Sequence, residues 1–468
     1  MDGPIHVQGV DEIIELKAAL AEALAEIARL RTEIVGLKEQ VRQNSRNSSK
    51  APSSDFGRRK LPKEPAGRKP GGQPGHAGTT REVVPPEKVD AFVDQDPEIC
   101  ANCGTPLEAA SRIDADLRQI VETPEFKAFV REFRLWKKRC PKCGGFTRGK
   151  MPPGSPKGAF GPRIQATAAM LSGRFRLSRR EVKALMGLIA GVEMSLGSVQ
   201  ACCEAASGAM AQAHGDLHAE VKAASAVHAD ETGFGRCGDL RMWLWNATSD
   251  VTEVFRLLPG RGGAQAKDLL GEGFSGILHR DRWKPYEHLP GARSQLCHAH
   301  LRRHFQAMLE SDGETATQGA MLKLASDRAF HLWHGFERGE IGRAELIQRM
   351  APIQKEIRLR LMVLRDHPAT QQKARGIAKD LLRQWESLWT YVHHEGAVPT
   401  NNEAERALRK AVLWRKGSFG VNSLQGAEFV ERILTLAGTT HRRGLDLLNW
   451  LTRAIQADLD GNPAPSLA

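Results

Sequence analysis

The stretch Ala226-Val-His-Ala-Asp-Glu-Thr232 sets the starting point for this chain, because it carries Asp230 at the end of a strand-like apolar run. A second apolar run, Gly276-Ile-Leu-His-Arg-Asp281, also ends on an aspartate. Glu405 lies in the first turn of a basic helical segment, Thr400-Asn-Asn-Glu-Ala-Glu-Arg-Ala-Leu-Arg409. Two strand-borne aspartates and one helix-borne glutamate can hold two divalent metals in one pocket, where they stabilise an in-line displacement at phosphorus.

The net charge indicates what such a site would act on. The chain carries a formal charge of +12 over 468 residues, which favours a polyanionic partner such as nucleic acid. It lacks a secretion signal and an apolar run long enough to span a bilayer. Half of its eight cysteines form two CxxC pairs, as in a cytosolic protein with reduced thiols. We therefore expect a cytoplasmic protein with no membrane partner.

The region around the two aspartates alternates between apolar and polar residues. It predicts four strands with one helix before the last strand: 226–234, 241–248, 251–258, the helix 263–271, and 275–281. This order is that of a ribonuclease H-like α/β core, in which the first and fourth strands are neighbours. Asp230 and Asp281 would then meet. Glu231 points to the opposite face of its strand and makes a poor co-ligand.

Two glutamates compete for the third position. If Asn402 caps the helix, Glu405 borders the apolar stripe beside Leu408 and Val412, whereas Glu403 points well away from it. However, Asn402-x-x-Glu405 also fits a capping box, in which Glu405 would only satisfy the helix end. Spacing alone leaves both interpretations of Glu405 open.

The N-terminal part is predicted to pair protomers. Within residues 1–44, the heptad pattern over 11–44 places mostly β-branched residues at a and mostly leucine at d, which favours a parallel two-stranded coiled coil and a homodimer or higher assembly. A single amphipathic helix packed on its own protein is the alternative. Residues 45–88 are basic and rich in proline and glycine, and predict a flexible linker.

Residues 89–150 contain the paired cysteines of a predicted zinc ribbon: Cys100, Cys103, Cys140 and Cys143. Two CxxC knuckles complete a tetrahedral four-sulfur site with no open position, so the zinc ion would be structural. Between the knuckles, Asp116–Val121 and Phe126–Trp136 predict a hairpin around Thr123-Pro124.

The remaining segments are helical. Residues 151–225 contain a Ser178-x-x-Glu181 capping box and a break at Gly191, which makes them a candidate helix-turn-helix that contacts DNA. Residues 226–300 would form the first part of the catalytic core. Residues 301–397 would be a helical insertion, and 398–468 would complete the core.

Six basic residues are candidate phosphate contacts, although each alone fits a solvated or ion-paired surface residue as well. They are Arg302, Arg303, Arg406, Arg409, Arg415 and Lys416.

Taken together, these motifs resemble the transposases of the insertion sequence 66 family. The matching stretches run in order along the chain: Asn44–Asp55, Lys69–His76, the two CxxC pairs, His228–Thr232, Asp281–Tyr286, Cys297–Arg303 and Asn401–Arg409 with Arg415-Lys416. Two departures are visible: Trp283 stands where the family often has tyrosine, and the segment from Arg415 to Gly420 is a loose match.

The resemblance implies a multidomain α+β DDE transposase with two Mg²⁺ or Mn²⁺ ions per site. By position, Asp230, Asp281 and Glu405 match the family's triad, which favours Glu405 over Glu403. It also implies double-stranded DNA partners (element ends and target), small accessory proteins of the same element, and work at the bacterial nucleoid.

Two rivals remain. The first is a DNA-binding regulator with a non-catalytic nuclease-like fold. The second is a tyrosine recombinase, which His300-Leu-Arg-Arg303 would suit but the positions of Tyr286 and Tyr391 fit poorly.

Overall fold

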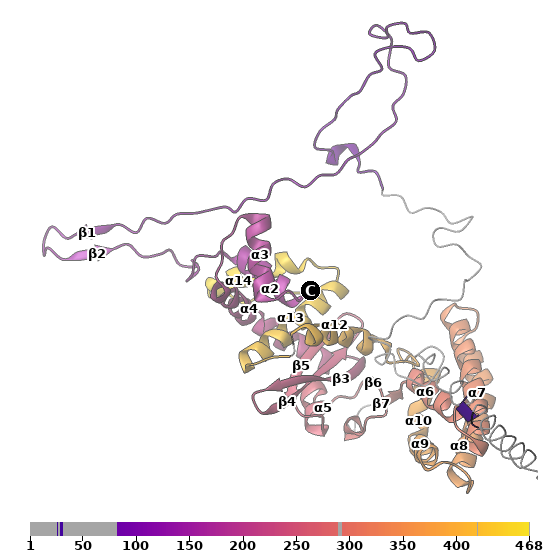
Figure 1. The fold of residues 1–468 in the computed structure, drawn as a ribbon. Helices are drawn as coiled ribbons and strands as arrows, with labels where there is room; N and C mark the ends of the chain where they lie inside the picture. The colour runs from indigo at the N-terminus through magenta and orange to yellow at the C-terminus, as the bar shows by residue number, and fades with distance from the viewer. Residues whose placement is uncertain (1–25, 27–28, 31–81, 289–292, 419, 468) are drawn as a thin grey trace, which may run out of the picture. The chain divides into compact units, whose positions relative to one another are not determined.

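The computed structural model describes residue 26 and residues 29–30, 82–288, 293–418 and 420–467 (Figure 1). The predicted coiled coil and most of the predicted linker lie outside these residues. The chain divides into two units, Arg58–Lys127 and the larger Ala128–Ala468, to which Met1–Gly57 is assigned. Each unit is described by itself.

A five-stranded mixed sheet forms the centre of the larger unit, in the order β5-β4-β3-β6-β7. The strands are β3 (Ala226–Cys237), β4 (Leu240–Thr248), β5 (Glu253–Pro259), β6 (Ile277–Arg280) and β7 (Arg293–Leu296). The first three pair antiparallel, whereas β6 lies parallel to β3 and β7 parallel to β6. The four predicted strands are present, and α5 (Gly263–Leu270) precedes β6 as expected. The short strand β7 was not predicted.

The pairing of β3 with β6 brings the two aspartates to one place. Val227 is level with Leu278, and His228 with His279, whose rings stack at 4.0 Å between centroids. Continuing this register along the parallel strands places Asp230 level with Asp281. The predicted neighbourhood of the first and fourth strands is therefore confirmed.

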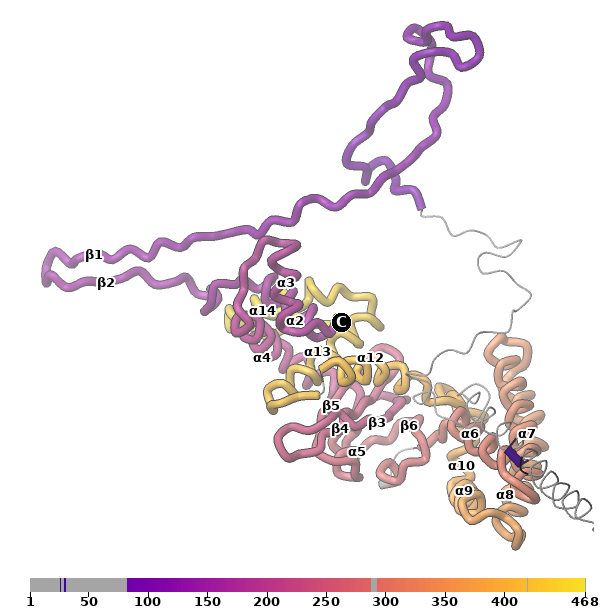
Figure 2. Tube along the Cα trace, viewed as in Figure 1, coloured from indigo at the N-terminus to yellow at the C-terminus, as the bar shows by residue number. Residues whose placement is uncertain are grey.

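Helices cover both faces of the sheet, because successive strand residues point to opposite sides. Trp245 and Ala247 pack in one apolar cluster with α4 (Leu196–Lys222), α5, α2 (Pro162–Gly173) and α14 (Leu447–Leu459). Leu244 packs in a second cluster with α12 (Asn402–Ser418). The helix α13 (Leu424–Arg442) contributes to both clusters and lies along β5. Figure 2 shows α12 and α13 lying beside the strands.

The helical segment before the sheet is part of this core rather than a separate domain. The helix α3 (Arg179–Ala190) begins at the predicted capping box: Ser178 Oγ accepts from the Glu181 amide at 3.2 Å, and Glu181 accepts from the Ser178 amide at 2.7 Å. It ends at Gly191, whose φ of 61° is left-handed. The following helix, α4, buries Met210 and Leu217 against the sheet. The expected boundary at residue 225 therefore cuts through one hydrophobic core.

The predicted helical insertion is a compact group of helices. It consists of α6 (His298–Leu309), α7 (Gly313–Glu337), α8 (Arg343–Asp366), α9 (Gln372–Arg383), α10 (Trp385–Leu388) and α11 (Thr390–His393). Leu322, Trp333 and Leu361 are among the residues of its own buried cluster. It begins three residues earlier than expected, directly after β7.

The two CxxC knuckles share one backbone pattern. In the first, the Cys100 amide donates to the Thr105 carbonyl at 2.8 Å and the Gly104 amide to Cys100 at 2.9 Å. In the second, the Cys140 amide donates to Gly145 at 2.7 Å and Gly144 to Cys140 at 2.9 Å. The strands β1 (Lys137–Arg139) and β2 (Phe146–Arg148) flank this second knuckle.

The hairpin predicted between the knuckles is wrong. Residues 116–121 and 126–136 contain no strand in the structure. Several of their apolar side chains are exposed to solvent: Ile120 is 94% and Phe129 83% exposed. An alternating pattern without a covered face is at most marginally stable as a hairpin in water.

Tight packing of α13 on β5 gives a stability prediction. A Cβ atom at Gly438 would lie 2.5 Å from Cδ and 3.0 Å from Cβ of the buried Glu253 side chain. We expect Gly438→Ala to lower the free energy of unfolding by about 1–3 kcal/mol. At Gly215 on α4 nothing lies within 4 Å, so Gly215→Ala is expected to raise it by up to about 1 kcal/mol. Urea denaturation measures both, and equal effects would contradict the packing argument.

A buried glutamate on the same helix predicts a pH dependence. Glu431 accepts from the Leu257 amide of β5, and burial raises its pKa to about 7. This pKa lies above that of the same group in the unfolded chain. The stability that protonated Glu431 contributes is therefore complete below pH 4.5 and is lost as the pH rises through about 7. Glu431→Gln keeps an acceptor for Leu257. When the pH rises from about 5 to about 8, we expect the free energy of unfolding of Glu431→Gln to fall by about 1–3 kcal/mol less than that of wild type. Urea denaturation at each pH measures this difference. Parallel pH profiles would contradict this.

Candidate active site

The first two acidic residues lie on neighbouring parallel strands, Asp230 within β3 and Asp281 at the carboxyl end of β6. Asp230 is on β3, and its Oδ1 accepts from the Glu231 amide at 2.9 Å. Asp281 directly follows β6, and its Oδ1 accepts from the Trp283 amide at 2.7 Å. Burial is the main reason that the pKa of Asp230 is raised well above its usual range, and the charges of Glu231, Asp281 and Glu405 raise it further. The Asp281 and Glu405 carboxylates are therefore close enough to repel that of Asp230.

The third acidic residue comes from α12, which is anchored on β3. This helix begins at Asn402. The sequence suggested Asn402 as the residue before the helix, so the helix begins one residue earlier than expected. Asn401 precedes the helix and is buried, donating from Nδ2 to the Ala229 carbonyl at 2.7 Å. Its Oδ1 lies 3.2 Å from Nδ1 of His228. Asn401 therefore ties the start of α12 to Ala229, the residue that precedes Asp230 on β3.

The two competing glutamates have different surroundings. Among the described residues, buried Oε1 of Glu405 finds no hydrogen-bond partner, and none of the hydrogen bonds there joins its side chain to Asn402. Burial raises the pKa of Glu405, and Asp281 adds to this against the opposing charge of Arg303. Glu403 instead pairs with Arg442 at 2.9 Å and with Arg406. The structure thus leaves Glu405 available to a ligand and occupies Glu403.

This donor set suits a divalent cation. The charge of Asp281 helps to raise the pKa of both Asp230 and Glu405, and a bound cation would relieve this repulsion. Carboxylate oxygens are the ligands that Mg²⁺ prefers, and the buried, unpartnered Oε1 of Glu405 offers one. The residues therefore fit the ions that the sequence predicts.

Sequence reasoning did not connect Cys297 and His300 with this site. Single ligand atoms of Cys297, His300 and Glu405 lie within 4.8 Å of one another. His300 Nδ1 is 3.5 Å from Glu405 Oε1, and burial lowers the pKa of His300 to about 4. Cys297 Sγ accepts from the Asn401 amide at 3.2 Å. The spacing of Cys297 and His300 was visible in the sequence, but their approach to Glu405 depends on how α6 meets α12.

Glu231 has its own partners. Its carboxylate accepts from the Tyr286 hydroxyl at 2.6 Å and from Arg261 Nε at 2.6 Å. Because both oxygens are engaged, Glu231 is a structural anchor beside Asp230.

The predicted phosphate contacts fall into two groups. Arg302 pairs with Asp327, Arg406 with Glu403, and Arg415 donates to the Gly233 carbonyl, which ties α12 to β3. Arg303 acts on the charge of Glu405, and the side chains of Arg409 and Lys416 are exposed. DNA contact by any of the six stays a prediction.

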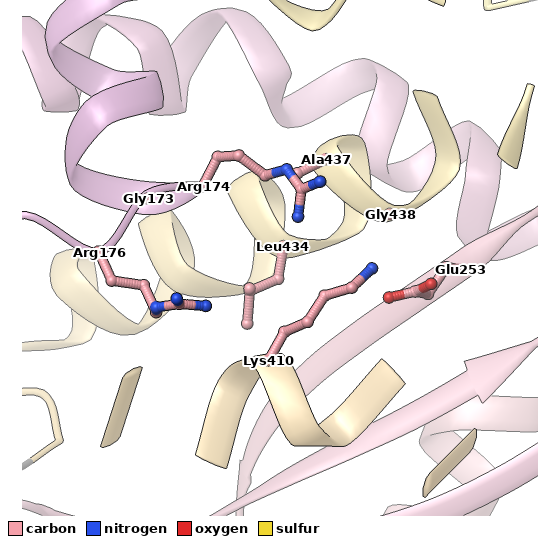
Figure 3. Close-up of a pocket in the computed structure, with 8 residues that line it drawn as sticks. All are labelled: Gly173, Arg174, Arg176, Glu253, Lys410, Leu434, Ala437 and Gly438. Atoms are coloured by element: carbon pink, nitrogen blue, oxygen red, sulfur yellow. The ribbon is translucent and has the colours of Figure 1, made fainter. Parts of the chain in front are cut away.

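A separate pocket lies between α2, α12, α13 and β5 (Figure 3). Its lining residues are Gly173, Arg174, Arg176, Glu253, Lys410, Leu434, Ala437 and Gly438. The Lys410 ammonium points towards Glu253, whose Oε1 is buried without a hydrogen-bond partner. None of the three clustered acidic residues lines this pocket, so it is distinct from the candidate active site.

The CxxC knuckles are suited to binding zinc as thiolates. Backbone amides, first that of Cys143 and then that of Lys142, lower the pKa of the Cys140 thiol. A hydrogen bond from Thr105 does the same for Cys103. Thiolate is the form that binds zinc.

A sheet-and-helix core with clustered carboxylates, in a chain that also carries two CxxC knuckles, defines a mixed α/β protein with a zinc-finger domain. The chain matches the family model described as "Transposase IS66 family" over residues 157–429, more than half its length, and it belongs to that family. The model for the zinc-finger binding domain of transposase IS66 matches residues 97–144, which include all four CxxC cysteines and support a structural zinc ion. Residues 6–82 match a family of unknown function, DUF6444.

Three proteins of Sinorhizobium fredii, each named as uncharacterized, are similar to this chain. The protein y4hP is 22% identical over 399 residues, covering 77% of this chain and 71% of its own length. The protein y4jD is 24% identical, covering 48% and 45%, and y4qI is 28% identical, covering 53% and 50%. The chain therefore spans about half the length of the last two. In the part of the chain that the structure describes, no helix has the length and hydropathy to cross a membrane.

Proposed function

We propose that this transposase-family protein cuts the ends of its mobile element and joins them to target DNA by DDE phosphoryl transfer. The single observation that carries the proposal is the convergence of Asp230, Asp281 and Glu405, with a buried Glu405 oxygen left unpartnered. The basic charge of the chain suits a DNA substrate.

The proposed catalytic core is ribonuclease H-like. Support comes from the strand order β5-β4-β3-β6-β7, with three antiparallel strands followed by two parallel ones. Further support is that Asp230 lies on β3, Asp281 directly follows the adjacent strand β6, and Glu405 lies on a helix packed against β3.

Asp230, Asp281 and Glu405 would hold two Mg²⁺ or Mn²⁺ ions. When bound, such ions stabilise the attacking and the leaving oxygen of an in-line displacement. Asn401 holds Glu405 against β3, and the hydrogen bond from the Trp283 amide fixes the carboxylate of Asp281. Two displacements would follow at this site: water cuts the element end and frees a 3′-hydroxyl, and that hydroxyl attacks target DNA.

The paired element ends would be held by a dimer formed through the N-terminal heptad segment. The zinc-finger domain and the helices α3 and α4 would contribute to end binding. These assignments rest on the sequence pattern, and accessory proteins of the element are further expected partners.

Cleavage and strand transfer on DNA carrying the gene's genomic flanks test the proposal. We expect Mg²⁺-dependent products from the wild-type chain and none from Asp230→Asn, with DNA binding retained by both. Wild-type protein that binds this DNA tightly and never cuts it, with any divalent metal or accessory protein added, would instead indicate a DNA-binding regulator.

A further inference from the structure

One tryptophan beside the candidate active site is exposed, unlike the tryptophans of the core. Trp283 is 37% exposed, whereas Trp245 is fully buried and Trp389 is 2% exposed. Trp283 lies two residues after Asp281, and its backbone amide donates to the carboxylate of that residue at 2.7 Å. The same short segment thus positions an indole ring and a proposed metal ligand.

The indole is braced by a charged side chain. The guanidinium carbon of Arg261 lies 4.0 Å from the centroid of the Trp283 ring and 4.9 Å from that of Trp243. Such stacking of a cation on an aromatic face is attractive and orients both groups. The brace holds Trp283 in place although the residue is partly exposed to solvent.

Arg261 is itself fixed to the core. It pairs at 2.6 Å with Glu231, whose side chain is fully buried, and Glu231 also accepts from the buried Tyr286 hydroxyl. The support of the exposed ring therefore runs through Glu231, which is next in sequence to Asp230. A surface tryptophan with only a packing role would not need this buried anchor.

We propose that Trp283 is a stacking platform for an unpaired nucleobase of the DNA strand next to the scissile phosphate. Aromatic rings bind unpaired bases of any sequence through their π-faces, and nearby cations bind the phosphates. Arg261 and the exposed Lys284 supply positive charge beside the ring. A base-paired duplex keeps its bases stacked on each other, so the platform selects frayed, flipped or single-stranded ends. This proposal rests on the proposed function, since it deepens the substrate of that site.

Three substitutions separate stacking from simple packing. Trp283→Phe keeps an aromatic face, Trp283→Leu keeps apolar volume without one, and Trp283→Ala removes both. The probe is a short DNA duplex with an unpaired 3′ overhang carrying one 2-aminopurine, whose fluorescence is quenched by stacking. A fully paired duplex of the same length is the matched control, and all measurements use the full chain.

We expect wild type and Trp283→Phe to quench the overhang probe, and Trp283→Leu and Trp283→Ala to bind that DNA about tenfold more weakly without quenching it. Binding to the paired duplex should change less than about twofold in all variants. Equal quenching by wild type and Trp283→Ala would overturn the platform, and so would Trp283→Leu behaving like Trp283→Phe. If wild type quenches the probe but never cleaves DNA, the platform stands and the transposase activity fails. If wild type cleaves DNA and Trp283→Ala changes neither quenching nor binding of the overhang probe, the transposase activity stands and the platform fails.

Discussion

Glu405→Gln is expected to abolish Mg²⁺-dependent DNA cleavage, with a loss of about a thousandfold or more. The substitution keeps the size of the side chain and removes the charge that would hold a divalent cation, which contributes several kcal/mol to the transition state. Its folded state should be at least as stable as that of wild type without metal, because burial disfavours the charged carboxylate and Asp281 adds repulsion against the opposing charge of Arg303. Cleavage kinetics and thermal unfolding measured on the same protein check both parts.

Glu403→Gln is the matched control, since it lies two residues away on the same helix. Glu403 pairs with Arg442 and Arg406, so its loss should change cleavage by less than about tenfold. Mg²⁺ should raise the unfolding temperature of wild type and of Glu403→Gln, but not of Glu405→Gln, because a ligand that binds only the folded state stabilises it. If Glu403→Gln instead lost cleavage and stabilisation by Mg²⁺ while Glu405→Gln kept both, the ligand role would belong to Glu403.

The sequence predicted the strands of the core well, since their pattern is local. Alternation identified β3, β4 and β5, and the apolar run before Asp281 identified β6. It missed β7, whose four residues, Arg293–Leu296, include three that are not apolar. Such a short edge strand exists because β6 offers it a parallel partner, which only the tertiary fold supplies.

The candidate site was predictable where it depended on strand order and unpredictable where it depended on side-chain partners. Adjacent strands bring Asp230 and Asp281 together whatever surrounds them. The choice between Glu405 and Glu403 needed the ion pair of Glu403 with Arg442, which lies 39 residues further along the chain. The prediction of a hairpin before Lys137 was wrong because the local alternating pattern is not enough to form one. Among the described residues, no partner covers its exposed apolar side chains, such as Ile120 and Phe129.

The burial of Asn401 leads to the second large effect. Its Nδ2 donates to the Ala229 carbonyl at 2.7 Å, its Oδ1 lies 3.2 Å from His228 Nδ1, and its amide donates to Cys297 Sγ at 3.2 Å. Asn401→Ala would leave the Ala229 carbonyl and the His228 ring buried without these partners. We expect the free energy of unfolding to fall by about 2–4 kcal/mol, since each unsatisfied buried group costs about 1–3 kcal/mol.

The same substitution should reduce cleavage more than the folded fraction falls, because Asn401 sets where α12 begins and so where Glu405 points. Asn402→Ala is the control: Asn402 is exposed, and its loss should cost less than about 1 kcal/mol. Urea denaturation gives the stability of each variant, and cleavage rates measured where both are folded give the positioning effect. Asn401→Ala protein that is fully folded and cleaves at the wild-type rate would show that α12 finds its place on β3 without this side chain.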